Sequence, residues 1–283
     1  MTPDEIARFR DVQQLAYRCT QAVERELRVG MTERVVARLM RRWLADHGVT
    51  EYFHVPFCWF GDRTSFTGAW NPLKFAPTAR RLEPGMPVIL DVAPSLDGYC
   101  ADIGYGCCLG ENAIWAKLQD DLAAHRTLIV DLVRQRRTAR EIYLAVDALA
   151  ARQGYENRHS VYPGRVLAHR VFRLPRTPLR KLVVGGFGAA ALHGLGSAAH
   201  AARARGQAEK WPLWNDRASS DVPVTAGLWA VEPHLGAGPV GSKWEEILVV
   251  TESDAYWLDD ELPHVRRWAE RGVLHSGQAY GSG

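Results

Sequence analysis

The chain has 283 residues, of which 47% are hydrophobic and 24% charged, and its net charge is +3. This is the composition of an ordinary globular protein with room for one large domain or two small ones. So small a charge gives no reason to expect a nucleic-acid partner. No apolar run approaches the ~20 residues that a membrane span needs.

The N-terminal stretch is charged from Asp4 onward and has no apolar core, so we expect no signal peptide. The cysteines form no CxxC pair and no zinc-ribbon spacing; they are Cys19, Cys58, Cys100, Cys107 and Cys108. Such isolated cysteines favour reduced thiols. We therefore expect a cytoplasmic protein without membrane association.

The first elements of the chain are helical. Apolar residues at helical spacing predict a helix over about 3–28. Thr32 can cap a second helix, which stops at Gly48. An extended, aromatic stretch over 52–60 follows, and then a loop rich in Pro and Gly.

The stretch 86–107 predicts a β-hairpin that carries an Asp on each strand, Asp91 and Asp102. If the turn centres on Leu96-Asp97, the two carboxylates are directly opposite each other. If it centres on Asp97-Gly98, they are diagonal but still on one face, because side-chain direction repeats every second residue. Two carboxylates so close repel unless a cation lies between them, and a divalent metal is the obvious candidate. The alternative is a surface hairpin with two solvated Asp residues.

The order of elements then repeats. Apolar spacing predicts a long helix over about 112–136, and Thr138 can cap a shorter helix that ends at Gly154. The step from Thr138 to Gly154 equals the step from Thr32 to Gly48. We interpret the chain as two α-α-β halves around one core.

The second half has a predicted hairpin of its own, with strands over 228–233 and 243–250 joined by the Gly-rich connection 236–242. Glu232 and Glu245 are almost equally far from its centre, so they can face each other. Four acids that converge in a core are costly without cations.

A stretch rich in Gly and Ala, residues 186–200, lies between the hairpins. Its small residues let backbones approach closely. His193 within it can add an imidazole to the carboxylates as a metal ligand. The alternative is a structural or exposed histidine.

Together these motifs resemble the metal-binding signature of the methionine aminopeptidase, prolidase and aminopeptidase P superfamily. The quoted motifs are Asp91-x10-Asp102, His193-Gly-Leu-Gly, Val231-Glu232-Pro233 and Trp244-Glu245-Glu246. The resemblance implies the α+β pita-bread fold, with two pseudo-symmetric α-α-β halves around a curved antiparallel sheet. It implies a single catalytic domain over 1–283, with halves at about 1–110 and 111–260 and a C-terminal helix and tail over 261–283.

The resemblance also implies two divalent metal ions, of manganese, iron, cobalt or zinc. Asp91 would hold one metal, Asp102 and Glu245 would bridge both, and His193 and Glu232 would complete the other. Such metals activate a bridging water as hydroxide, and Glu232 would be the proton shuttle.

Two further positions are implied to contact the substrate. His200 matches a family histidine that contacts the substrate or the tetrahedral intermediate, and its alternative is a surface histidine. Lys74 stands where the family has a histidine, and its fixed charge would suit an anionic substrate group; the alternative is a solvated lysine.

Other departures are less readily assigned. Asp102 is followed by Ile-Gly-Tyr-Gly, where the family commonly has Thr or Ser. A basic stretch over 158–181 is interpreted as a lid, a contact to a partner subunit or a solvated loop.

The first hypothesis is therefore a metal-dependent hydrolase of peptide or amide bonds that is similar to aminopeptidases or prolidases and acts on a short peptide or small molecule. The second places non-peptide chemistry on the same metals, either creatinase-like C–N hydrolysis or iron-dependent oxidation of an amino-acid-like substrate. The third is a non-catalytic binding protein. A homodimer is compatible with the family.

Overall fold

The computed structural model describes residues 1–68 and 75–274. Its helices are α1 (Pro3–Glu26), α2 (Glu33–Asp46), α3 (Ala113–Arg134), α4 (Ala139–Arg152), α5 (Ala189–Ala204) and α6 (Pro263–Glu270). None of the helices in these two ranges is both long and apolar enough to cross a membrane.

Within the described residues, the strands form three sheets. The first contains β1 (Glu51–Phe60), β2 (Pro87–Leu96), β3 (Tyr99–Cys100), β4 (Ile103–Cys108), β7 (Val183–Val184) and β8 (Phe187–Gly188). The second contains β6 (Ala168–Val171), β9 (Leu213–Trp214), β10 (Gly227–Val231), β13 (Glu246–Val250) and β14 (Ala255–Trp257). The third contains β5 (Glu156–Asn157), β11 (His234–Ala237) and β12 (Val240–Lys243).

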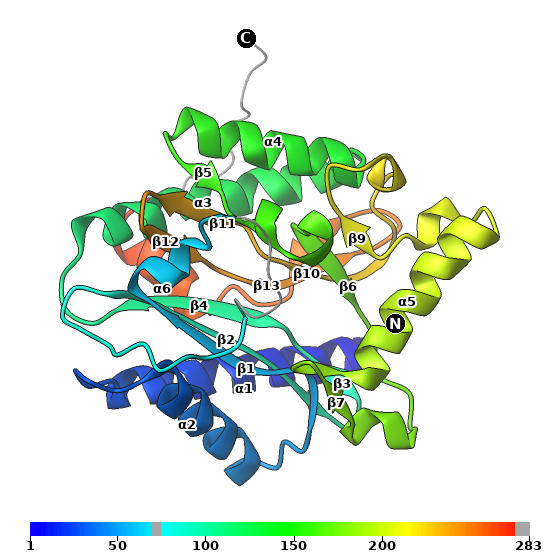
Figure 1. Cartoon of the computed structure of the whole chain (residues 1–283). Helices are drawn as coiled ribbons and strands as arrows, with labels where there is room; N and C mark the ends of the chain where they lie inside the picture. Colours follow the sequence, from blue (N-terminus) through cyan, green and yellow to red (C-terminus); the bar gives the residue numbers. More distant parts are fainter. Residues whose placement is uncertain (69–74, 275–283) are drawn as a thin grey trace.

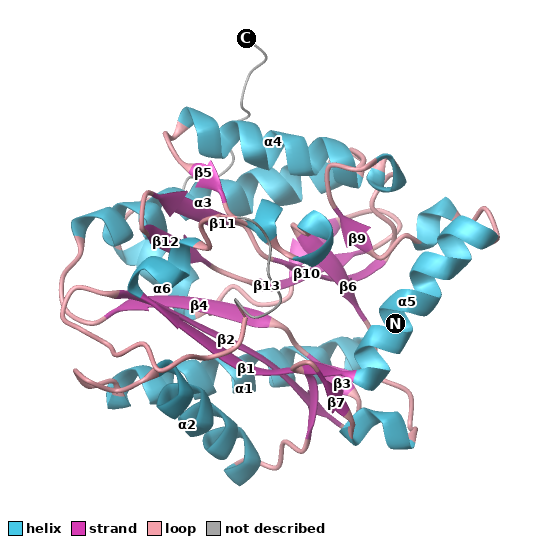
Figure 2. Ribbon diagram, in the orientation of Figure 1, coloured by secondary structure: helices cyan, strands magenta, loops and turns pink. Residues whose placement is uncertain are grey.

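The sheets occupy the middle of the molecule, with α1 and α2 on one side and α3 and α4 on the other (Figures 1 and 2). The predicted caps explain where the two shorter helices begin. The Thr32 side chain accepts a hydrogen bond from the backbone N–H of Val35. Thr138 and Glu141 form a reciprocal capping box. Two α-helix pairs followed by strands thus occur in the predicted order.

The register of the first hairpin decides between the two predicted turns. Leu96 pairs with Tyr99, so Asp97 and Gly98 form the turn, and both have positive φ, at 52° and 86°. Asp91 lies opposite Gly104. Asp102, two residues before Gly104, is therefore diagonal to Asp91 and on the same face.

The second predicted hairpin differs from the structure. Its two long arms are each broken in the middle, so that β10 pairs with β13 and β11 pairs with β12. One break is at Glu232-Pro233, where Pro233 has no N–H for a sheet ladder. At the other break, the N–H of Glu245 donates to the carbonyl of Gly104. Glu232 and Glu245 therefore lie at the points where the chain passes from one sheet to another.

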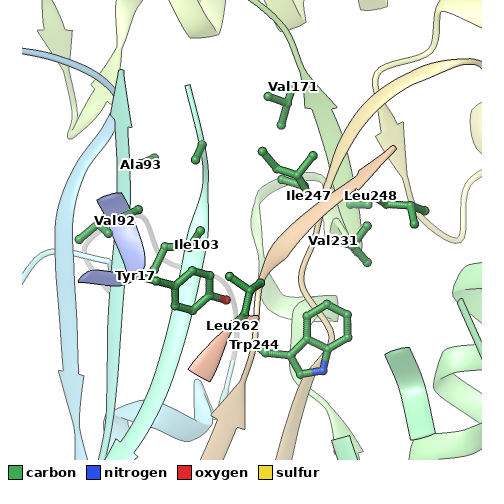
Figure 3. Close-up of a cluster of buried hydrophobic side chains, with 14 of the residues drawn as sticks. Tyr17, Val92, Ala93, Ile103, Val171, Val231, Trp244, Ile247, Leu248 and Leu262 are labelled. Carbon is green, nitrogen blue, oxygen red and sulfur yellow. The ribbon is translucent and has the colours of Figure 1, made fainter. Parts of the chain in front are cut away.

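Apolar side chains fill the space between the two larger sheets (Figure 3). Val92 and Ile103 of the first sheet lie on one side, and Val231 and Ile247 of the second lie on the other. Tyr17 of α1 reaches across and donates its hydroxyl to the carbonyl of Glu245 at 2.7 Å. The core thus fixes the positions of the two hairpins relative to each other.

A buried charged network joins the second half to α6. The guanidinium of Arg126 donates to both carboxylate oxygens of Glu246, at 2.7 and 3.1 Å, and to Asp260 at 2.9 Å. His264 is 3.0 Å from the same Glu246 carboxylate. Burial opposes the charge of Glu246, but Arg126 outweighs it and lowers the pKa of the carboxyl.

We predict that Arg126→Met lowers the free energy of unfolding by about 3–5 kcal/mol, because Glu246 would be left buried and uncompensated. Urea denaturation followed by circular dichroism measures the loss. Arg134→Met, in the same helix, removes an exposed pair with Asp254 and should cost less than about 1 kcal/mol. Equal losses for the two variants would contradict a structural role for the buried network.

Candidate functional site

A pocket of about 470 Å³ opens over the first hairpin. Its walls are aromatic and aliphatic, and include Phe53, Phe57, Trp59, Phe75, Tyr162, Val166, Phe187, Leu192, Leu195 and Leu213. Its floor is charged and contains His54, Asp91, Asp102, His169, Glu232, Lys243 and Glu245. The pocket thus combines an apolar entrance with a buried ionic floor.

The four predicted carboxylates do converge on this floor. Asp91 lies in β2, Asp102 directly before β4, Glu232 directly after β10, and Glu245 between β12 and β13. None of the four residues is more than 7% exposed. Burial raises the pKa of Glu232 to about 7 although Lys243 lowers it.

Lys243 stands among three of these acids. Its ammonium Nζ is 2.8 Å from Asp91 Oδ2, 2.8 Å from Glu232 Oε2 and 2.9 Å from Glu245 Oε2. Burial opposes the charged form, but the three carboxylates outweigh it and raise the pKa of Lys243 well above its ordinary value. The lysine side chain is only 2% exposed.

Gly104 makes room for this lysine. A Cβ at position 104 would lie 2.0 Å from Lys243 Cε, which is closer than real Cβ atoms approach other heavy atoms. Gly104 belongs to the Ile-Gly-Tyr-Gly segment that follows Asp102. With a glycine at this position, the inward conformation of the Lys243 side chain meets no Cβ.

His54 of β1 lies against two of the acids. Its Nε2 is 2.9 Å from Asp91 Oδ1 and 2.8 Å from Asp102 Oδ1, and its Nδ1 is 2.8 Å from the carbonyl of Val55. Burial opposes the charged form of the ring, but Asp102 and Asp91 outweigh it and raise the pKa of His54 well above its ordinary value. Among the described residues, His54, Asp91 and Asp102 form one of two groups whose donor atoms lie close enough together to hold a metal ion.

His169 of β6 places an imidazole beside Asp102 and Glu245. Its Nε2 is 3.1 Å from Asp102 Oδ2 and 3.9 Å from Glu245 Oε1, and its ring stacks on Phe53. One donor atom from each of Asp102, His169 and Glu245 lies within 4.8 Å of the other two. Two carboxylates and one imidazole suit a divalent metal such as manganese, iron, cobalt or zinc.

The prediction for His193 needs correction. His193 lies on α5, which stands at one end of the sheets (Figure 1). Its side chain is exposed, and it lines a separate hollow with His200. The face of α5 toward the apolar pocket carries Leu192, Leu195 and Ala199 instead. His169, and not His193, therefore adds the imidazole to the carboxylates.

The same helix geometry applies to His200. Residues seven apart lie on nearly the same face of an α-helix, so His200 shares the exposed face of His193 rather than facing the carboxylates. Lys74, the other predicted substrate contact, lies outside the described residues. His200 is not among the residues that line the apolar pocket.

The basic stretch over 158–181 is largely tied to the protein itself. Arg165 pairs with Asp216 at 2.9 Å, and Arg170 donates to the carbonyl of Ala226 and packs over the Trp229 ring. Arg180 pairs with Glu51. These contacts favour a structural role for much of the stretch.

His54, His169 and Lys243 were not predicted as site residues. A signal existed for His54, because it is a titratable residue within a strand whose neighbours are apolar. His169 is followed by the charged Arg170 and gave no such signal. Lys243 lies two residues before Glu245. No local sequence pattern indicates that its side chain faces the acids.

Solved structures share this arrangement of sheets, helices and hairpins. X-Pro aminopeptidase from Thermotoga maritima MSB8 superposes with a TM-score of 0.67 at 16% identity, over 91% of this chain and 61% of that one. Prolidase from Pyrococcus horikoshii OT3 gives 0.64 at 16% identity, over 92% and 64%. Methionine aminopeptidase from Rickettsia prowazekii gives 0.62 at 14% identity, over 91% and 98%.

These likenesses establish a protein of the pita-bread fold, as the sequence predicted. The model of metallopeptidase family M24 matches residues 7–252, and the chain therefore belongs to this family. No curated protein sequence matches the chain significantly. The chain spans about three fifths of the length of the X-Pro aminopeptidase and the prolidase that it matches.

We predict that His169→Ala weakens Mn²⁺ or Zn²⁺ binding more than about 100-fold, since even residues behind a metal's direct ligands change affinity by about 10–100-fold. His193→Ala and His200→Ala should bind as the native chain does, because both side chains are exposed. Isothermal titration calorimetry measures all three. Loss of binding in His193→Ala would restore the assignment made from the sequence.

Proposed function

We propose that the chain is a metal-dependent hydrolase that cleaves a peptide or amide bond in a small substrate with a bulky apolar group. The observation that carries the proposal is the convergence of the four signature carboxylates and one imidazole below an apolar pocket. Membership of family M24 supports the same chemistry. The similar structures include an X-Pro aminopeptidase, a prolidase and a dipeptidase, which suggests peptides as the substrate class to test.

Asp102, His169 and Glu245 would hold a divalent cation, which supplies a polarised carbonyl or an activated water at neutral pH. The chain's own groups provide the rest. Glu232 lies on the same pocket floor, and burial raises its pKa to about 7, so the carboxyl group can take up and return a proton. The aromatic walls exclude water and strengthen the electrostatic interactions on the floor.

The two-metal centre with a bridging hydroxide, which the resemblance implies, remains a prediction. Lys243 stands among three of its expected ligands, Asp91, Glu232 and Glu245. A substrate contact from Lys74 also remains a prediction.

Non-peptide chemistry at the same site is the second candidate. The observation that favours it is the presence of a lysine ammonium, that of Lys243, within the acid cluster. This group changes the charge of the pocket floor and therefore the kind of substrate that the floor would bind. Hydrolysis of a small C–N compound and iron-dependent oxidation of an amino-acid-like substrate both belong to this candidate.

We predict that the protein cleaves members of a dipeptide panel containing Met-Xaa and Xaa-Pro substrates with Mn²⁺, Co²⁺, Zn²⁺ or Fe²⁺. Removal of the metal by a chelator, or Asp102→Asn, should lower kcat/KM at least about 100-fold. Asp97→Asn removes an exposed carboxylate from the same hairpin and should leave kcat/KM unchanged. Bound metal without cleavage of any peptide would favour the second candidate.

We predict that Phe187→Ala raises KM for substrates with an aromatic side chain by about 10-fold or more, since a hydrophobic contact is worth about 1–3 kcal/mol. The ring of Phe187 lies 5.8 Å from the ring of Phe57 across the pocket wall. Substrates with an alanine in the same place should change little. Steady-state kinetics on the matched pair of substrates make the test, and an equal change for both would exclude a selective apolar contact.

A further inference from the structure

We propose that the ammonium group of Lys243 replaces one of the two metal ions of the family's centre, so that this site binds a single divalent cation at Asp102, His169 and Glu245. The inference refines the proposed function and rests on it only for the presence of that one cation. It assigns a role to a residue that the proposed hydrolysis does not use.

The contacts of Lys243 are complete without a metal. An ammonium group has three N–H donors, and Nζ has three carboxylate oxygens at 2.8–2.9 Å, one from each of Asp91, Glu232 and Glu245. A metal ion bound by these oxygens would need them at about 2.0–2.2 Å. The ammonium and a metal therefore compete for one position.

The surroundings are shaped for the lysine. Gly104 leaves the space that Cε occupies, and the Cβ of any other residue there would lie 2.0 Å from it. Nζ also lies 5.4 Å from the centre of the Tyr162 ring, within the range of a cation–π contact. Lys243 itself is held in β12 opposite His234. The glycine, the ring and the strand all favour the inward position of the side chain.

In the part of the chain that the structure describes, two groups of donors could hold an ion: His54 with Asp91 and Asp102, and Asp102 with His169 and Glu245. In the first group, Asp91 is paired with Lys243 through Oδ2, and His54 Nε2 lies against Asp91 Oδ1 and Asp102 Oδ1. The second group offers Asp102 Oδ2, His169 Nε2 and Glu245 Oε1, and none of these is an atom that Lys243 engages. The second group is therefore the one that fits a single ion beside Lys243. The position of Lys243 and the position of this group use different oxygens of Glu245.

The test compares the metal content of the native chain with that of Lys243→Met, which keeps the length of the side chain but removes the charge. After equilibrium dialysis against excess Mn²⁺ and then brief gel filtration, elemental analysis should find about one ion per native chain and about two per Lys243→Met chain. Lys117→Met removes an exposed lysine that pairs with Asp121, and should keep about one ion.

Two ions in the native chain, or equal metal content in the native chain and Lys243→Met, would overturn the inference. If Lys243→Met folds only with metal, its melting temperature at increasing Mn²⁺ gives the same answer. The variant should gain more stability from Mn²⁺ than the native chain does, and an equal gain would overturn the inference. Peptide cleavage is scored separately, so one bound ion without any cleavage would contradict the proposed function and leave this inference standing.

Discussion

Four carboxylates buried at one point are the constraint on which this structure depends. Such a cluster is unstable unless positive charge lies among the oxygens, because each charge has lost its hydration. In this chain Lys243 places an ammonium group among three of the acids. Under our proposal this side chain takes the place of one metal ion.

The fold brings these groups together from distant parts of the chain. Asp91 and Asp102 come from one hairpin, whereas Glu232 and Glu245 lie where the strands of the other change sheets. The carbonyl of Gly104 accepts the N–H of Glu245, and so joins the two hairpins beside the cluster. The same Gly104 leaves space for Lys243. A single glycine therefore serves both the contact between the halves and the charge balance of the site.

Periodic and local signals in the sequence predicted most of the fold. The capped helices at Thr32 and Thr138 and the hairpin carrying Asp91 follow from short-range rules. The break of the second hairpin was not predicted, because it depends on pairing with separate strands. His193 was chosen for its motif, yet a helical segment rich in Ala exposes it. His169 reaches the acids only through the pairing of β6 with β10, which no local pattern reveals.

A crystal structure of the native protein soaked in Mn²⁺, with anomalous diffraction recorded for manganese, would locate the metal ions among the four acids. We expect one anomalous peak, between Asp102, His169 and Glu245, with Lys243 still in contact with Asp91 and Glu232. Two peaks among the carboxylates, with Lys243 turned away from them, would contradict this expectation.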